Sequence, residues 1–264
     1  DIEYKEILIS TYICHPSMAN NELSGICVTT FLANWIMSMA PMKYTYRIVF
    51  VPETIGSIAY LSMHHENMKK KVFAGFNVTC VGDDRSYSFL PSRSGNTISD
   101  KVAKHVLKFV DPDFICYSWF DRGSDERQYC APGVDLPIAS IMRSKYAAYP
   151  EYHTSKDDLV SVVSPIGLQG GYLAIQKALI ALEHNVFYNS SFLCEPHLSK
   201  YGLYNTTSKK QQHYKGNTIL DILSLCDGKT MLLDIADALN LPIWDILPII
   251  KQLETNGLIS EGKI

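Results

Sequence analysis

The chain alternates short runs of β-forming residues with segments of helical periodicity. Residues 7–14 form the first run, which stops at Pro16, and the apolar residues between 28 and 39 are then spaced by threes and fours. Such spacing is typical of an amphipathic helix that covers one face of a sheet. Further β-forming runs lie at residues 46–51, 72–81 and 138–142. This order predicts an α/β domain with a mostly parallel, mixed sheet sandwiched by helices.

Polar residues that can bind a metal ion follow these runs. His15 follows the first, Glu53 the second and Asp83 and Asp84 the third, whereas His153 lies in the loop after the fourth. Open α/β sheets bind ligands at the carboxyl ends of their strands. Two imidazoles with one or two carboxylates suit zinc and leave room for a water molecule. The sequence therefore predicts a zinc site at this edge.

The segment around His153 strengthens this interpretation. The histidine lies between Tyr152 and Thr154, and Asp157 follows four residues later. Neighbours of this kind can fix the ring and the tautomer of a metal-binding histidine. We expect Asp157 to orient the ring of His153.

Several segments, taken in order, resemble a known family, the zinc-dependent aminopeptidases with a co-catalytic metal pair, whose fold is shared by the glutaminyl cyclases. Residues 152–157 are similar to its last metal-histidine motif, residues 19–25 to its Asp-Asn-Ala-Ser-Gly turn, and residues 53–57 to its Glu-Glu-x-Gly-x-x-Gly-Ser motif. The resemblance covers roughly residues 5–185 and implies the family's fold and its zinc chemistry.

A closer similarity is to a bacterial subgroup described as aminopeptidase-like proteins of polysaccharide biosynthesis with a winged-helix tail. It rests on the sequence motifs at residues 15–17, 52–57, 92–95 and 122–129. The subgroup implies no particular substrate.

Three positions depart from the family pattern. Asn21 stands where the family has its bridging aspartate, Thr54 stands where it has the second glutamate, and Thr79 stands where it has a strand aspartate. A bridging ligand between two dications is normally an anionic carboxylate. Asn21 therefore leaves open whether the site binds one zinc ion or two. Glu22, one residue further on, could replace Asn21 as the bridging ligand. The missing strand carboxylate would come from Asp83, or from its neighbour Asp84.

The resemblance implies metal-assisted hydrolysis of an amide in a peptide or in an amino-acyl or amino-sugar-linked substrate. Zinc would polarise the carbonyl group, and Glu53 would act as the base. In the alternative arrangement Glu53 is a ligand of a single zinc ion, and Asp125 or another carboxylate carries the acid/base role. Arginine and tyrosine side chains suit contacts to substrate anions and oxyanions, and we assign this role to Tyr146, Tyr152, Arg127 and Arg143.

A second hypothesis treats the chain as a catalytically degenerate aminopeptidase fold. The substitutions at Asn21 and Thr54 would then mark a binding or assembly module in polysaccharide biosynthesis. We favour the hydrolase because His15, Glu53 and His153 are all present.

The C-terminal segment has the pattern of a separate small domain. We predict an α/β domain over residues 1–185, a linker over 186–216, and a winged helix-turn-helix over 217–264. Residues 215–264 contain four lysines and seven acidic residues, a net charge of −3. Contacts to nucleic-acid phosphates need clustered basic residues. We therefore expect no nucleic acid as a partner, and we expect instead a packing or dimerisation module that could form a homo-oligomer.

Composition and sequence pattern indicate the cellular compartment of the protein. No window approaches 18 uninterrupted apolar residues, the first residues lack the pattern of a signal peptide, and the seven cysteines are odd in number and widely spaced. These features predict a cytoplasmic protein with reduced thiols and no membrane partner. The chain opens almost directly on its first strand, so we expect it to lack N-terminal elements of a longer protein.

Overall fold

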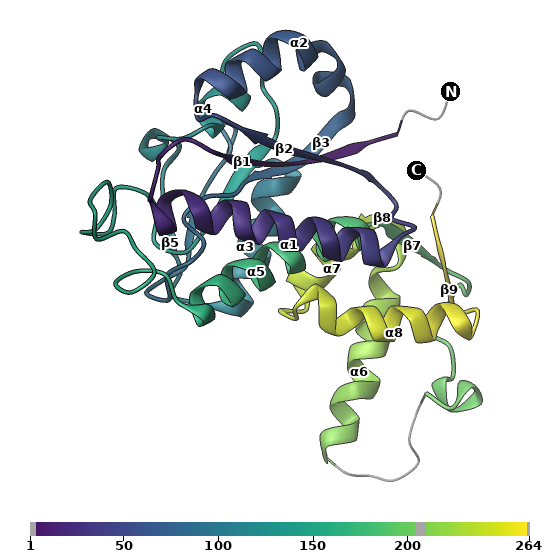
Figure 1. Cartoon of the computed structure of the whole chain (residues 1–264). Helices are drawn as coiled ribbons and strands as arrows, with labels where there is room; N and C mark the ends of the chain where they lie inside the picture. The colour runs from purple at the N-terminus through teal and green to yellow at the C-terminus, as the bar shows by residue number, and fades with distance from the viewer. Residues whose placement is uncertain (1–3, 204–209, 263–264) are drawn as a thin grey trace. The chain divides into compact units, whose positions relative to one another are not determined.

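The computed structural model describes residues 4–203 and 210–262. The chain divides into two compact units, Asp1–Leu179 and Ile180–Ile264 (Figure 1). Each unit has its own sheet and its own buried side chains.

The N-terminal unit is built on a six-stranded sheet with the order β2-β1-β3-β6-β4-β5. Strand β1 is parallel to β2 and β3, β3 is parallel to β6, and β4 is antiparallel to β6 but parallel to β5. The prediction of a mostly parallel, mixed sheet is therefore confirmed. The strands are β1 (Glu6–Tyr12), β2 (Thr45–Val51), β3 (Val72–Asn77), β4 (Ser88–Leu90), β5 (Ile115–Cys116) and β6 (Ile138–Met142).

Helices cover the sheet. Figure 1 shows α2 and α4 over one face of the sheet and α1 with α5 over the other. All seven residues of β1 are buried, as expected for a strand with neighbours on both sides and helices on both faces. The helical elements of this unit are η1, a short π-helix (Ala19–Leu23), α1 (Ser24–Met39), α2 (Ile55–Lys71), α3 (Ile98–Val110), η2 (Trp119–Asp121), α4 (Glu126–Tyr129) and the larger part of α5 (Pro165–His184).

The start of α1 lies directly against the ends of two strands. A Cβ atom added to Gly25 would lie 2.6 Å from both Thr11 Oγ1 and the Val78 carbonyl oxygen. Real Cβ atoms do not approach other atoms so closely, so only glycine fits at this position. The close contact holds the preceding η1 turn beside the carboxyl end of β1.

The C-terminal unit combines a three-stranded antiparallel sheet, β8-β7-β9, with three helices. The predicted winged helix-turn-helix is confirmed, because residues 185–261 match a winged helix-turn-helix family. Its elements are β7 (Phe187–Ser190), η3 (Leu198–Tyr201), α6 (Lys210–Leu225), β8 (Asp227–Met231), α7 (Leu232–Ala238), α8 (Ile243–Thr255) and β9 (Ile259–Glu261).

The segment 186–216, which we expected to be a linker, contributes the central strand of this sheet. Strand β7 pairs with both β8 and β9, and its Tyr188 side chain is buried. Residues 204–209 of the same segment lie outside the described residues. The sequence analysis missed this strand because its composition is polar and tyrosine-rich. In so short a strand only one side chain needs to face the core, so no apolar pattern marks it.

Within the described residues, no helix combines the length and the apolar character needed to cross a membrane.

Candidate functional site

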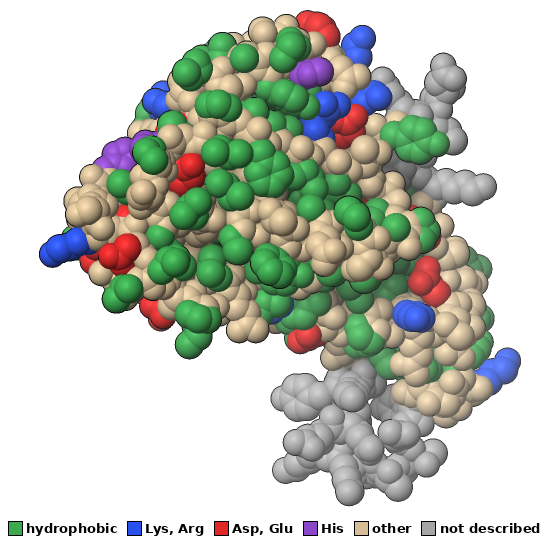
Figure 2. All heavy atoms as spheres, in the orientation of Figure 1, with side chains coloured by type: hydrophobic (Ala, Val, Ile, Leu, Met, Phe, Trp, Pro, Cys, Tyr) green, Lys and Arg blue, Asp and Glu red, His purple; other side chains and the backbone are tan. Residues whose placement is uncertain are grey.

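The parallel register of β1 and β2 brings the first two predicted site residues together. Tyr12 pairs with Val51 at the carboxyl ends of the two strands, and the Ile13 amide donates to the Val51 carbonyl. Two residues further on, Cys14 and Glu53 therefore lie side by side. Figure 2 shows exposed imidazole groups at the end of the unit toward which β1 runs.

A group of three potential metal ligands forms at this point. The ligand atoms of Cys14, His15 and Glu53 all lie within 4.8 Å of one another. His15 and Glu53 are half-buried, and Cys14 is exposed. Ligands of a tetrahedral zinc ion lie about 3.3–3.8 Å apart, given bonds of about 2.0–2.3 Å. A modest rotation of these accessible side chains would reach that spacing.

Glu22 holds the backbone that carries these ligands. Its carboxylate accepts a hydrogen bond from the Cys14 amide at 2.6 Å and another from the His15 amide. The same carboxylate lies 3.6 Å from His15 Nδ1. A carboxylate beside Nδ1 favours the tautomer that carries its proton there, which leaves the lone pair of Nε2 for a metal. In the sequence analysis Glu22 was only a substitute for Asn21, because its contact with His15 depends on the η1 turn.

The structure brings the two predicted metal histidines together. The ring centroids of His15 and His153 are 4.7 Å apart, and the His153 ring stacks on Tyr152 at 3.8 Å. His153 has a φ of 56°, in the left-handed region that costs energy for a residue with a side chain. The loop thus holds this exposed histidine in a conformation that directs it toward His15.

Asp157 has a different role from the one we expected. Its carboxylate accepts hydrogen bonds from the amides of Asn20 and Asn21 at 2.7 and 3.0 Å and from the Tyr149 hydroxyl at 2.9 Å. The side chain is fully buried. Asp157 therefore fastens the loop of His153 to the η1 turn, and none of these three bonds is to the His153 ring.

Asp83 lies apart from the group of potential ligands. Each oxygen of this buried carboxylate accepts two hydrogen bonds. Oδ2 accepts from the Asn20 side-chain amide and the Ser144 backbone amide, and Oδ1 accepts from the Arg85 backbone amide and the Ser144 hydroxyl. A carboxylate has about four acceptor positions, so its capacity is filled. The neighbouring Asp84 accepts from the Ser164 hydroxyl at 2.8 Å. The filled hydrogen bonds argue against the expected ligand role of Asp83, and the carboxylate grouped with His15 and Cys14 belongs to Glu53.

Neutral side chains occupy the position of the expected bridging ligand. The Tyr12 hydroxyl lies 2.8 Å from Asn21 Oδ1 and 2.7 Å from Thr79 Oγ1, and all three side chains are buried. The Asn21 amide group also lies 3.4 Å from His15 Nδ1. Asn21 is thus adjacent to the site, but its oxygen is already hydrogen-bonded and carries no charge.

Asp125 is a buried carboxylate close to Glu53. One oxygen accepts from the Thr54 amide at 2.7 Å and from the Ser57 hydroxyl at 2.9 Å. The other, Oδ2, is buried without a hydrogen-bond partner among the described residues. Burial raises the pKa of Asp125 from 3.8 to about 6, although the two hydrogen bonds oppose the shift. Asp125 therefore gains a proton more readily than an ordinary aspartate.

We expect Asp125→Asn to change how stability depends on pH. A carboxyl group with a raised folded-state pKa binds more protons in the folded protein, so its contribution to stability is complete below about pH 4 and is lost as the pH rises to about 6. The variant should lack this part of the decline. Urea unfolding at several pH values between 4 and 7 measures the difference, and parallel curves for the two proteins would contradict it.

The four residues predicted to contact substrate divide into two pairs. Tyr146 donates to Glu126 at 2.7 Å and accepts from the Gly123 amide, and Arg143 donates to the Asp83 carbonyl while stacking on a tyrosine ring. Both are buried and hold loops in place.

The other pair lies beside the candidate site. Arg127 is exposed and donates to Thr54 Oγ1 at 3.0 Å, next to Glu53. Tyr152 is half-buried against His153, and burial raises the pKa of its hydroxyl to about 12. A neutral hydroxyl and a guanidinium group thus remain available near the two histidines.

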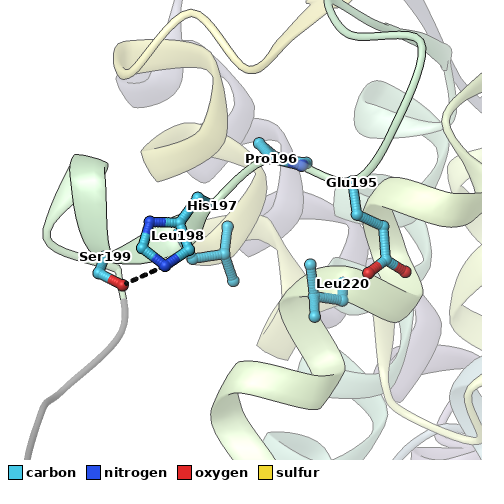
Figure 3. A pocket seen from close by; sticks show the side chains of 6 residues that line it. All are labelled: Glu195, Pro196, His197, Leu198, Ser199 and Leu220. Carbon is cyan, nitrogen blue, oxygen red and sulfur yellow. Dashed lines mark hydrogen bonds between the residues drawn. The ribbon is translucent and has the colours of Figure 1, made fainter.

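Two cavities among the described residues have other linings. One in the C-terminal unit is lined by residues 195–199 and Leu220, and Figure 3 shows the hydrogen bond of 3.3 Å between its His197 and Ser199 side chains. Another, between α1 and α5, is apolar and includes Phe31 and Tyr172. Neither of these two cavities is lined by His15 or Glu53.

Together, the parallel sheet, the histidines at its carboxyl edge and the winged helix define an aminopeptidase-like protein with a C-terminal winged helix-turn-helix. Residues 2–185 match the model of a family described as a domain of unknown function, DUF4910, and residues 185–261 match a winged helix-turn-helix family. The chain belongs to the DUF4910 family.

Relatives agree with this class. A Clostridium acetobutylicum protein, described as a candidate polysaccharide biosynthesis protein with an aminopeptidase-like domain, is 38% identical over 234 residues. These cover 88% of this chain and 53% of the relative, so the chain spans about half the length of the curated relative it matches. A crystal structure of a candidate peptidase from the same organism has a TM-score of 0.88 at 35% identity, and the match covers 98% of this chain and 58% of that one.

More distant structures share the fold alone. A zinc aminopeptidase from Bacillus subtilis has a TM-score of 0.56 at 17% identity, over 68% of this chain and 46% of that one. A glutaminyl cyclase from an Acidobacteriales bacterium has a TM-score of 0.55 at 14% identity, over 68% and 70%. The resemblance of the sequence to both groups is thereby confirmed at the level of fold.

Proposed function

We propose that this protein is a zinc-dependent hydrolase that cleaves an amide bond. The observation that carries the proposal is the position of His15 at the carboxyl edge of the sheet, in one group with Glu53 and with its ring 4.7 Å from that of His153. Imidazoles with one adjacent carboxylate form a donor set that suits zinc. A zinc ion bound here would polarise the substrate carbonyl and activate a water molecule.

Glu53 would act as the base. It follows β2 directly and lies within reach of the ligand atom of His15, so it can accept a proton from the attacking water and pass it to the leaving nitrogen. Asp125 lies behind Glu53 and is more easily protonated than an ordinary aspartate, so it could share that proton. The neutral cluster of Tyr12, Asn21 and Thr79 favours one zinc ion over two, because Asn21 supplies no anionic oxygen to bridge a pair.

Arg127 and Tyr152 would position the substrate. The guanidinium group suits a carboxylate or phosphate, and the tyrosine hydroxyl can donate to a developing oxyanion. A peptide, or an amino-acyl or amino-sugar-linked amide, would present such groups. The name of the Clostridium relative, which mentions polysaccharide biosynthesis, supports the amino-sugar-linked class.

One observation favours a second candidate, a binding or assembly module without catalysis. The hydrogen bonds among Tyr12, Asn21 and Thr79 satisfy these residues without any metal. A fold that had lost its metal centre would show such a neutral, closed network.

The variant Glu53→Gln tests the proposal. We expect zinc to bind with unchanged stoichiometry, and amide hydrolysis to fall by about 10²–10⁴-fold, because glutamine cannot take up a proton. Zinc content by elemental analysis and turnover of a panel of aminoacyl and N-acyl amino-sugar amides are the measurements. Glu66→Gln, on the exposed side of α2, is the matched control. A wild-type protein that binds no added zinc would refute the hydrolase and favour the binding module.

A further inference from the structure

We infer that Cys14 is the third protein ligand of the metal, so that the centre is a Cys-His-His site with Glu53 free to act as base. The inference rests on the proposed function, and it assigns a residue that the resemblance to aminopeptidases does not supply. A catalytic zinc usually has three protein ligands and one open position. His15 and His153 provide two, and the third remains to be found.

The aspartates expected to provide the third ligand do not belong to the group of potential ligands found among the described residues. Asp83 uses all its acceptor positions for hydrogen bonds, and Asp84 caps the start of α5 through Ser164. Asn21 is neutral and hydrogen-bonded to Tyr12. If Glu53 were the third ligand, it could not also move protons freely.

Cys14, by contrast, lies in the group of potential ligands. Its sulfur is within 4.8 Å of the ligand atoms of both His15 and Glu53. The thiol forms no disulfide and is exposed, so it can be reached by a metal ion. The β1 and β2 register places it opposite Glu53, and the bond from its amide to Glu22 holds its backbone.

Charge supports the same assignment. The family's metal pair relies on a bridging carboxylate, and Asn21 removes that negative charge from this chain. A thiolate at Cys14 would restore one negative charge next to the ion, because zinc binds the deprotonated sulfur. Thiolate and imidazole ligands can share one catalytic zinc ion, as in the Cys₂His site of alcohol dehydrogenases, and a Cys-His-His set would likewise leave one position open.

A sulfur ligand has a consequence that nitrogen and oxygen ligands lack. Thiolates select soft or borderline ions such as zinc, cobalt and cadmium over magnesium, calcium and manganese. A bound Co²⁺ or Cd²⁺ ion would also show a thiolate-to-metal charge-transfer absorption band, which an all-nitrogen and oxygen site does not produce.

The test is a titration of the metal-free full chain with Co²⁺ and with Cd²⁺, followed by ultraviolet and visible absorption. We expect the wild type to develop the charge-transfer band at one ion per chain. Cys14→Ser should lose the band and bind zinc at least about tenfold more weakly, by analogy with the loss of a metal-supporting side chain. Cys27→Ser, an exposed cysteine on α1, should behave as the wild type.

The outcomes separate this inference from the proposed function. If one metal ion binds without the band, and with equal affinity in Cys14→Ser, then Cys14 is not a ligand, although the hydrolase proposal stands. If the wild type binds no metal at all, both fail. Because Cys14 is exposed, the serine variant should fold, and the wild-type spectrum tests the assignment even without the variant.

Discussion

His15→Ala is expected to abolish zinc binding and every activity that depends on it. Within the described residues, His15 is the ring that contacts both halves of the site, because it lies 4.7 Å from His153 and in one group with Glu53. Loss of residues that merely support a ligand costs 10–100-fold in metal affinity, so removal of a ligand itself should cost more than about 100-fold. Elemental analysis after dialysis against a fixed free zinc concentration measures this loss.

Two further variants make the His15 experiment specific. His153→Ala should have the same effect, because the two rings would hold one ion together. His64→Ala should have none, since that ring packs on Tyr60 along α2 and not at the strand ends. Retention of stoichiometric zinc in both site variants would place the metal elsewhere in the chain.

The sequence predicted the fold and the location of the candidate site because both depend on local patterns. Runs of β-forming residues followed by helical spacing indicated an α/β sheet, and the motifs at His15, Glu53 and His153 lie directly after strands or in a loop at the same edge. Chain connectivity places residues of this kind at one edge of a parallel sheet. The structure brings these three residues together.

The surroundings of the other candidate ligands depend on pairings between residues that are distant in the sequence. The proximity of Cys14 to Glu53 follows from the register of two strands that are distant in the chain. The hydrogen bonds that saturate Asp83 come from Asn20, Arg85 and Ser144, two of them more than 60 positions away. A carboxylate looks the same in a sequence whether it faces a metal or a set of amides.

Asp157 illustrates the same limit, because its partners are mainly backbone amides. A backbone N–H carries no sequence signal, so the motif suggested a bond to the neighbouring histidine. The structure instead directs the carboxylate to the start of η1. Asp157 therefore contributes to stability, because it joins the two segments that carry the proposed metal ligands His15 and His153.

Asp157→Ala is expected to destabilise the protein by about 3–5 kcal/mol, because it leaves the amides of Asn20 and Asn21 and the Tyr149 hydroxyl without their buried acceptor. Asp157→Asn should cost less, since one oxygen remains to accept a bond. Urea unfolding measures both values, and the exposed Asp113→Asn variant should stay within about 0.5 kcal/mol of wild type.

The same substitution should also weaken zinc binding. Without Asp157, the loop of His153 is no longer fastened to the turn that supports His15, and the two rings must be ordered when the metal binds. We expect zinc affinity to fall by about 10–100-fold in the folded variant, the usual cost of removing a side chain that holds ligands in place. A destabilised Asp157→Ala protein with wild-type zinc affinity would show that the two loops reach the metal independently, and that this carboxylate serves the fold alone.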